Sequence, residues 1–492
     1  MTVRDWHTLA QSVTYPTGLL IDGAWQGGAG SLEVTSPIDG RVITEVAAGD
    51  AGDVDRAVQA ARRAFDDKRW RGKSPMERGD ILVRWADLCL ARADDLAVLH
   101  TIEMGKPARE ARDVDMRGVV RTIRWFGQAI DKIVDEIPNT APNSLALVER
   151  EPAGVVAAVV PWNFPLTMAV WKLTPALATG CSVVLKPAEK SPLSALLLCE
   201  LAMEAGIPAG VINVVNGLGH VAGRALGLHP DVDVLTFTGS TEVGRAFMAY
   251  AAESNLKRVW PELGGKSANI IFPDADLDKA ANTAAWSIFY NAGQMCTAGS
   301  RLLVHASVHD EVLTKVLAVA ASMQPGDPLD DLAPLGAVVS AQHLGQIHDK
   351  VTRGSQASGE ILVGGGPTRT ETGGSYYPPT VIDGVDPTSL LSQEEIFGPV
   401  LAVTTFDTES DALRLANGTQ YGLASAVWTS DLNRAHRVAR ELKVGVVWVN
   451  CYEEGDVTVP FGGVKQSGFG RDKSLHALDM FTDLKTTWIE LS

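Results

Sequence analysis

The sequence predicts an α/β protein in which two domains are each built on a largely parallel sheet and a smaller β element stands apart from them. A chain of 492 residues exceeds what one hydrophobic core can organise, so it is expected to divide into two or three domains. From residue 155 onward, short runs of Val, Ile and Leu alternate with helical segments. This alternation is typical of a parallel sheet that is covered by helices on both faces.

The predicted elements follow one another in a regular order. Residues 53–133 are mostly helical in pattern, because Val54, Val58 and Phe65 recur at helical spacing, and the pattern turns to short β near residue 145. The first alternating series comprises strands at residues 155–160, 182–186, 211–215 and 234–237, helices at 167–178 and 191–205, and a third helix that begins near residue 240. The second series has strands at residues 269–272, 301–304 and 400–406.

The C-terminal segment, residues 481–489, is predicted to be an edge strand. The β segment at residues 144–149 is its expected partner. An exposed apolar edge of this kind needs to be covered, which makes the pair a candidate contact between subunits.

Composition and charge exclude several classes of partner. The net charge of −16 argues against nucleic acid or an anionic membrane. No apolar run approaches the roughly 20 residues that span a bilayer, and the N-terminus lacks the basic start and apolar stretch of a secretory signal. The five cysteines are scattered without Cys-x-x-Cys spacing, so neither a disulfide framework nor a metal site is expected. These features favour a cytoplasmic protein.

One cysteine stands out from the others. Cys296 lies among small, turn-forming residues between Gly293 and Gly299, where backbone and substrate can approach the sulfur. Upstream, Glu262 precedes a diglycine at residues 264–265. A thiol with an ordinary pKa of about 8.5 is only slightly ionised at neutral pH, so a nucleophilic cysteine needs help from its surroundings. On these residues alone, a structural cysteine and an ordinary turn are the more frequent interpretation.

Several motifs that occur in a fixed order favour a catalytic cysteine over a structural one. They are residues 161–165 (PWNFP), 186–189 (KPAE), 237–241 (FTGST), 262–266 (ELGGK), the Cys296 segment, 394–399 (EEIFGP) and 460–463 (PFGG). Together they resemble the motifs of the aldehyde dehydrogenase superfamily, and the resemblance extends from about residue 21 to the C-terminus.

The resemblance implies a domain organisation. A Rossmann-like NAD-binding domain is expected at residues 1–133 and 153–264, and an α/β catalytic domain containing the nucleophile at 265–465. Residues 134–152 and 478–492 are expected to form oligomerisation strands. A homodimer or a homotetramer is implied, and the sequence does not choose between them.

The resemblance also assigns residues to the cofactor. They are Val160, Trp162, Lys186, Glu189, Gly219, Gly239, Ser240, Gly244, Glu395 and Phe397. A carboxylate at Glu189 can accept from both ribose hydroxyls and would repel a 2′-phosphate, which favours NAD, although Lys186 could still tolerate NADP. Taken alone, residues 239–244 fit an ordinary helix cap by Ser240, and Lys186 with Glu189 fits a surface ion pair.

The implied chemistry has two stages. Cys296 attacks the aldehyde carbonyl to give a thiohemiacetal, whose oxyanion would be stabilised by the Asn163 side chain and the Cys296 N–H. After hydride transfer leaves a thioester, Glu262 activates the water that releases the acid. Glu262 also argues for hydrolysis and against transfer to coenzyme A, because acylating relatives typically lack it. Asn163 could equally be a turn residue, and Lys172 could relay protons, tune Glu262, or simply snorkel to solvent.

The substrate is expected to be a linear C3–C6 ω-amino or ω-acylamino aldehyde. Residues 254–260, 455–463 and 465–477 resemble the subgroup of γ-glutamyl-γ-aminobutyraldehyde and ω-aminoaldehyde dehydrogenases of putrescine and other polyamine catabolism. The predicted substrate-contacting residues are Phe164, Met168, Trp171, Glu453, Asp456 and Phe461. The acidic loop at residues 453–456 (EEGD) could attract an ammonium or guanidinium tail, or could be only a solvated loop. The apolar members could pack a methylene chain or belong to the core.

Other functions stay open at this stage. A broad-specificity aliphatic or 3-hydroxypropanal dehydrogenase would use the same machinery. A thiol hydrolase without a cofactor would leave Lys186, Glu189 and Glu395 without a purpose, and binding of NAD to the purified protein separates it from a dehydrogenase. A catalytically silent protein on the same fold is the third alternative.

Overall fold

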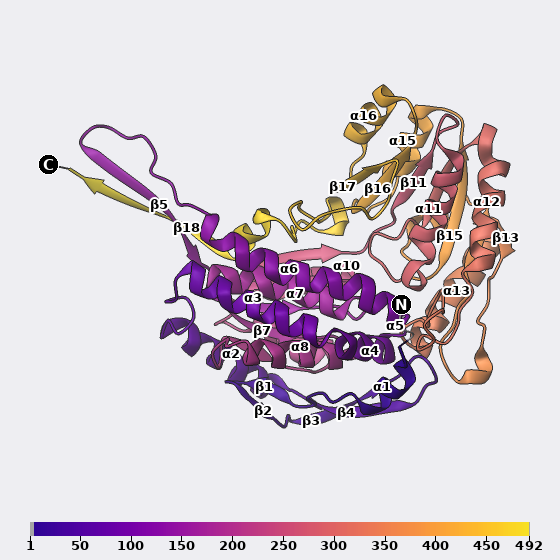
Figure 1. Cartoon of the computed structure of the whole chain (residues 1–492). Helices are drawn as coiled ribbons and strands as arrows, with labels where there is room; N and C mark the ends of the chain where they lie inside the picture. The colour runs from indigo at the N-terminus through magenta and orange to yellow at the C-terminus, as the bar shows by residue number, and fades with distance from the viewer. Residues whose placement is uncertain (1–3, 492) are drawn as a thin grey trace.

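The computed structural model describes residues 4–491, which fold around two seven-stranded sheets (Figure 1). The first sheet has the strand order β10-β9-β6-β7-β8-β1-β2. Its parallel strands are β6 (Val155–Val159), β7 (Ser182–Lys186), β8 (Ile212–Val214), β9 (Val234–Gly239) and β10 (Arg258–Leu263). The short strand β1 (Leu19–Ile21) pairs antiparallel with β8, and β2 (Ala24–Gln26) pairs antiparallel with β1.

Helices cover both faces of this sheet, because its strands are apolar on both sides. Val156 and Ala158 pack into a core with α7 (Pro165–Thr179) and α8 (Leu193–Glu204). The alternate residues Val155 and Ala157 face the other core. That second core is formed with α2 (Ala51–Asp66), α9 (Arg224–Leu228) and α10 (Thr241–Glu253).

The predicted helical region before the sheet is confirmed. After α2 it contains α3 (Pro75–Ala91), α4 (Ala93–Met104), the short α5 (Ala108–Glu110), a π-helical turn η1 (Ala111–Asp115) and α6 (Met116–Ala129). Helices α3, α4 and α6 pack against α7 and α8 in one continuous core. A short helix α1 (Trp6–Ser12) and a two-stranded sheet of β3 (Gly30–Thr35) and β4 (Val42–Ala48) precede them.

The second sheet has the order β13-β14-β15-β12-β11-β16-β17 and is parallel except at β13. Its strands are β11 (Ala268–Ile271), β12 (Arg301–His305), β13 (Glu360–Val363), β14 (Thr380–Asp383), β15 (Val400–Phe406), β16 (Ala424–Trp428) and β17 (Val446–Val449). The helices of this half are α11 (Leu277–Phe289), α12 (His309–Ser322), α13 (Ala341–Ala357), α14 (Leu390–Gln393), α15 (Glu409–Asn417) and α16 (Leu432–Glu441). Leu302 packs in a core with α11 and α12, whereas Leu303 faces α15 and α16.

The C-terminal edge strand and its partner are as predicted. β18 (Thr482–Glu490) pairs antiparallel with β5 (Ser144–Pro152), and the two-stranded arm projects away from the rest of the molecule with the C-terminus near its tip (Figure 1). Leu484 and Trp488 on this arm are 64% and 62% exposed.

The strands predicted in both alternating series are all present at nearly the predicted residues. β1 to β4, β10, β13, β14, β16 and β17 were not predicted. Between the second sheet and the arm, the chain returns to the first sheet, where the N–H groups of Phe469 and Gly470 donate to the Pro261 carbonyl at 3.2 and 3.0 Å. Among the described residues, no helix is both long and apolar enough to cross a membrane.

Candidate active site

A cavity of about 570 Å³ lies where the first sheet, the second sheet and α13 meet. It gathers many of the residues predicted for the site. Those that line it are Trp162, Asn163, Phe164, Met168, Gly239, Ser240, Glu262, Cys296, Glu395 and Phe397. The other predicted residues, which lie outside its lining, are Val160, Trp171, Lys172, Lys186, Glu189, Gly219, Gly244, Glu453, Asp456 and Phe461.

The loop after α11 carries Cys296 into this cavity. Asn291 and Ala292 adopt left-handed backbone conformations, and Gly293 follows with φ +69°. A Cβ added at Gly293 would lie 2.1 Å from the Gly398 carbonyl oxygen, so only glycine allows this approach. The strained turn therefore fixes Cys296 against the segment that carries Glu395 and Phe397.

Asn163 is held by the nucleophile loop and not by its own turn. Its side chain is buried, and its Nδ2 donates to the Gln294 carbonyl at 2.9 Å. Asn291 Nδ2 donates in return to the Asn163 carbonyl at 3.3 Å. The alternative that Asn163 only bonds its own backbone is wrong, because its amide is bonded to Gln294, two residues before Cys296.

Glu262, near the end of β10, is 1% exposed, and neither carboxylate oxygen has a hydrogen-bond partner among residues 4–491. Burial raises its pKa to about 8. The charge of Lys172 and the nearby Cys296 thiol lower the pKa, while Asp472 raises it. A buried carboxyl with no resident partner is free to exchange a proton with a thiol or a water in the cavity.

The surroundings of Cys296 do not favour a resting thiolate. Burial raises the pKa of its thiol well above the usual value, and the negative charges of Glu262, Glu453 and Glu395 raise it further. The expected help for ionisation therefore cannot come from a neighbouring cation. It requires a proton acceptor, and Glu262 is the carboxyl placed to serve.

Lys172 lies behind Glu262 and is buried. Its Nζ donates to both carboxylate oxygens of Asp472, at 2.8 and 2.6 Å, and both side chains are buried. The alternative that Lys172 snorkels to solvent is therefore wrong. Asp472 was not predicted as a site residue, although it lies in the 465–477 segment that carried the subgroup resemblance.

Asp472 also fixes the loop that carries Phe461. The backbone N–H groups of Phe461 and Asp472 donate to each other's carbonyls, both at 2.7 Å. The ion pair with Lys172 thus ties the C-terminal loop to α7, beneath the catalytic cavity.

Glu395 is locked beside the diglycine that follows Glu262. Its Oε1 accepts from the Gly265 N–H at 3.0 Å, and a Cβ at Gly264 would lie 2.2 Å from its other oxygen. Lys350 Nζ donates to the Glu395 carbonyl at 2.7 Å. Burial raises the pKa of the Glu395 carboxyl to about 7.

Three aromatic rings meet at the cofactor end of the cavity. The Trp162 ring lies 5.3 Å from both Phe397 and His343, edge-on to each. His343 Nε2 donates to the Phe397 carbonyl at 2.8 Å, which holds Phe397 in a left-handed backbone conformation with φ +59°. His343 is an addition to the predicted site, and a histidine on α13 outside any recognised motif gave no signal in the sequence.

The helix cap at Ser240 is real. Ser240 Oγ accepts from the Val243 N–H at 3.3 Å and caps α10, so the positive end of this helix faces the cavity. A Cβ at Gly244 would lie 2.7 Å from the Leu263 side chain, which explains this glycine by packing of α10 against β10. The Ser240 side chain takes only the Val243 N–H, which leaves other N–H groups at this helix start for an anion, so both interpretations of this segment remain compatible.

Lys186 and Glu189 form an ion pair at 3.6 Å, but only Glu189 lies at the surface. Lys186 is buried, and burial lowers its pKa, whereas Glu189 is 40% exposed. Val160 donates its N–H to the Lys186 carbonyl at 3.1 Å and is buried. Gly219 begins an exposed π-helical turn.

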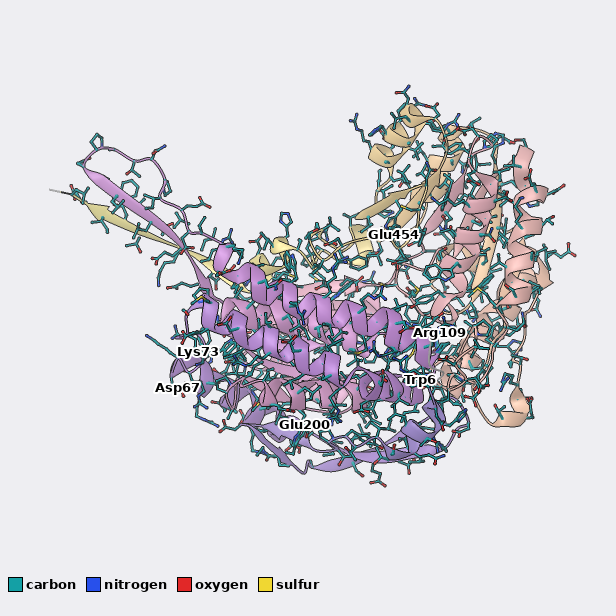
Figure 2. All side chains as sticks on the ribbon, in the orientation of Figure 1. Trp6, Asp67, Lys73, Arg109, Glu200 and Glu454 are labelled. Carbon is teal, nitrogen blue, oxygen red and sulfur yellow. The ribbon has the colours of Figure 1, made fainter. Side chains whose placement is uncertain are left out.

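The acidic loop divides into three environments. Glu454 is exposed (Figure 2). Asp456 forms an ion pair with Arg121. Glu453 has a buried Oε1 without a hydrogen-bond partner in the described chain. The single interpretation of a solvated loop therefore fits only Glu454.

Trp171 and Phe461 pack against each other, with ring centroids 5.2 Å apart. Trp171 lies one helical turn beyond Met168 on α7, and Met168 lines the cavity. The two rings therefore adjoin the cavity without forming its lining. Within residues 4–491, no cluster of three or more His, Cys, Asp or Glu side chains could hold a metal ion.

Comparisons with known proteins agree with this geometry. Residues 25–487 match the model of the aldehyde dehydrogenase family. The chain is 49% identical over 489 residues to the NADP/NAD-dependent aldehyde dehydrogenase PuuC of Escherichia coli, covering 99% of this chain and 98% of that protein. It is 47% identical over 493 residues to the aminoacetaldehyde dehydrogenase of Pseudomonas aeruginosa, covering 99% of each.

Solved structures give the same result for the fold. An indole-3-acetaldehyde dehydrogenase in complex with NAD+ superimposes with a TM-score of 0.99 at 51% identity, over 100% of both chains. The γ-glutamyl-γ-aminobutyraldehyde dehydrogenase of Burkholderia cenocepacia gives 0.97 at 52% identity, over 99% of both. The expected family and fold are confirmed: this chain belongs to the aldehyde dehydrogenase family.

Proposed function

We propose that this protein oxidises an aldehyde to the free carboxylic acid with NAD as the hydride acceptor. The observation that carries the proposal is the pairing of Cys296 with Glu262, a buried carboxyl without a resident hydrogen-bond partner, in one cavity with Asn163. A structural cysteine would need neither a base nor an amide donor at that place.

The chain's own residues account for each proton. Glu262 takes the thiol proton as the Cys296 sulfur bonds to the carbonyl carbon, giving a thiohemiacetal. The Asn163 amide and the Cys296 N–H stabilise the negative charge on the former carbonyl oxygen. Glu262 then releases the thiol proton to solvent, and after the carbon has lost a hydride and become a thioester, the ionised Glu262 deprotonates the attacking water. The carbon–sulfur bond then breaks, and the acid and the thiol are released.

The residues present fit a dinucleotide. The cavity extends from the capped N-terminus of α10 at Ser240 to Glu395 and Cys296, and glycine at 264 leaves room that a side chain would fill. Ser240 and the α10 N-terminus would hold the pyrophosphate, and Glu395 would accept from a ribose hydroxyl. When bound, the nicotinamide supplies the hydride acceptor. Glu189 beside Lys186 favours NAD while leaving NADP possible, and the PuuC relative is described as using both.

A cofactor-independent thiol hydrolase is the weaker alternative. It would give no role to Glu395, whose carboxylate lines the cavity and accepts from the Gly265 N–H. A catalytically silent protein on the same fold is disfavoured, because Cys296, Glu262 and Asn163 are all present around one cavity.

The substrate class is an ω-amino or ω-acylamino aldehyde. Support comes from the unpartnered Glu453 near Cys296 and from relatives that act on aminoacetaldehyde and γ-glutamyl-γ-aminobutyraldehyde. A broader range of aldehydes is the second candidate, because a chain at 51% identity acts on indole-3-acetaldehyde.

The exposed arm of β5 and β18 supports a homodimer or homotetramer in which a second copy covers Leu484 and Trp488. Five free cysteines support a reducing, cytoplasmic setting.

Formation of NADH from NAD and a panel of aldehydes, followed by absorbance, tests this function. We expect activity that is abolished in Cys296→Ala and retained in Cys451→Ala, a variant of a cysteine outside the cavity. Bound NAD without NADH from any aldehyde would contradict the proposal. So would activity that survives Cys296→Ala.

A further inference from the structure

Lys473 occupies an unusual position next to the catalytic cavity. Its ammonium lies over the Trp171 ring at 5.4 Å and over the Phe461 ring at 5.5 Å. A Cβ built on Gly455 would lie 3.7 Å from its Nζ, so the ammonium also approaches the backbone of the acidic loop. Two aromatic faces stabilise a cation, but they accept no strong hydrogen bond from it.

Two neighbouring carboxylates are already paired with other side chains, whereas Lys473 forms no ion pair in the described part of the chain. Asp472, the preceding residue, is taken by Lys172, and Asp456 is taken by Arg121. Across residues 4–491, Lys473 forms no ion pair and donates no hydrogen bond. It is partly buried, so solvent does not fully replace such a partner.

Glu453 is the complementary unpaired group. Its Oε1 is buried without a hydrogen-bond partner in the described residues. Its charge acts on the Cys296 thiol and on the Lys473 ammonium, so it lies near both. The region beside the cavity therefore presents an acceptor at Glu453 and a donor at Lys473, over the Trp171 and Phe461 rings.

Two classes of tail would meet this pair differently. An aldehyde that carries an N–H near its middle and a carboxylate at its far end could donate to Glu453 and accept from Lys473. A bare ω-ammonium could satisfy Glu453 only, and would approach Lys473 with like charge. Asp456 offers such an ammonium no alternative, because Arg121 holds it.

We propose that Lys473 is a specificity-determining residue that binds the distal carboxylate of the substrate, so that the preferred aldehydes are ω-acylamino aldehydes with a carboxylate-bearing acyl group. The inference rests on the proposed dehydrogenase function and chooses within its substrate class. The Trp171 and Phe461 rings hold the Lys473 ammonium in place, and its unbonded N–H groups are the part that meets the substrate.

The test compares three aldehydes that share a four-carbon chain. They are 4-aminobutanal, 4-acetamidobutanal and 4-succinamidobutanal, and the last differs from the second mainly by its carboxylate. Each is assayed by NADH formation with the wild-type protein, Lys473→Met, Lys473→Arg and the control Lys315→Met. Met keeps an unbranched stem over the rings and Arg keeps the charge. Lys315, on α12, pairs with Asp278 and Glu311 outside the cavity.

We expect the wild type to prefer 4-succinamidobutanal in kcat/KM. Lys473→Met should lose roughly tenfold or more on that substrate, mainly through KM, and change less than about twofold on 4-acetamidobutanal. Lys473→Arg should keep most of the preference, and Lys315→Met should match the wild type. Activity on 4-aminobutanal should rise in Lys473→Met as the like charge is removed.

An equal loss on all three aldehydes would overturn the inference, as it would mean that Lys473 only supports the fold, and melting temperatures would identify that case. Equal wild-type activity on the acetamido and succinamido compounds would overturn it as well. Both results are still consistent with the proposed dehydrogenase activity. Absence of NADH from every aldehyde is the distinct outcome that would contradict the proposed function, and with it the carboxylate-binding role of Lys473.

Discussion

Lys172 and Asp472 form a buried ion pair directly behind Glu262, with Nζ to carboxylate distances of 2.8 and 2.6 Å. The two partners act on the Glu262 carboxyl in opposite directions, Lys172 lowering its pKa and Asp472 raising it. Burial is the largest influence, and it raises the pKa of Glu262 to about 8. The base is thus adjusted by charges that line no part of the cavity itself.

Replacing Glu262 by Gln should slow both the attack of Cys296 on the aldehyde and the hydrolysis of the thioester. The amide keeps the size of the side chain but cannot accept a proton from water, so kcat should fall by about 10²–10⁴-fold. Any acylated enzyme that still forms should persist, because its thioester lacks the base for hydrolysis, and intact-protein mass spectrometry after mixing with aldehyde and NAD should detect it. Unchanged steady-state turnover in Glu262→Gln would rule out Glu262 as the base.

The rate should rise with pH through the region near 8. Glu262 works as a base only when it is ionised, and burial has raised its pKa to about 8, so the carboxylate fraction increases from pH 7 to 9. The raised pKa of the Cys296 thiol acts in the same direction. A profile of kcat/KM against pH checks this. A flat profile over that range would mean that neither group controls the rate.

Asp472→Asn should move that profile to lower pH. The substitution removes the carboxylate that raises the pKa of Glu262 and leaves the Lys172 charge uncompensated, so Glu262 ionises more easily. Stability should drop by about 3–5 kcal/mol, because a buried lysine loses its partner. The double variant Lys172→Met with Asp472→Asn should recover much of the stability and return the profile toward the wild type. If Asp472→Asn shifts the profile upward, the electrostatic account is wrong.

Local pattern predicted the central strands well for a physical reason. Strands buried on both faces, such as β6 and β7, need continuous apolar runs, and such runs are visible in the sequence. The missed strands lack that signature. β1 and β2 have only three residues each, and the four-residue β13 is mostly exposed. Their pairing is decided by neighbours distant in the chain.

The site residues divide in the same way, into those visible in local sequence and those decided by distant contacts. Cys296, Glu262 and Asn163 lie in motifs whose composition is itself unusual. By contrast, Asp472 matters because it meets Lys172 across 300 residues, and a single aspartate in a polar segment carries no mark of that contact. His343 and Lys473 were missed for the same reason, since their roles come from rings brought to them by folding.

Gly293→Ala should damage both folding and activity. Left-handed backbone costs a non-glycine residue about 1–2 kcal/mol, and the added Cβ would lie 2.1 Å from the Gly398 carbonyl oxygen. The loop would have to move and would take Cys296 with it. Gly345→Ala on α13 is the matched control, because nothing lies within 4 Å of its added Cβ and helical Ala is favoured. Equal melting temperatures and activities for the two variants would contradict this account of the loop.

Trp488→Glu should reduce the mass of the assembly in solution. Trp488 is 62% exposed on the arm of β5 and β18, and a charge there would have to be buried if a second copy covers this surface. Size-exclusion chromatography with light scattering gives the mass directly. Leu332→Glu is the control, because Leu332 is 83% exposed but lies outside the arm, so that variant should keep the wild-type mass.

The two variants together separate assembly from stability. Since Trp488 packs little within its own chain, Trp488→Glu monomers should keep their fold, and circular dichroism should change little between the wild type and both variants. A monomeric wild type would refute the role of the arm at once. An unchanged oligomer in Trp488→Glu would move the interface to another surface, because an uncompensated carboxylate buried at a contact costs several kcal/mol and a standard interface cannot absorb it unnoticed.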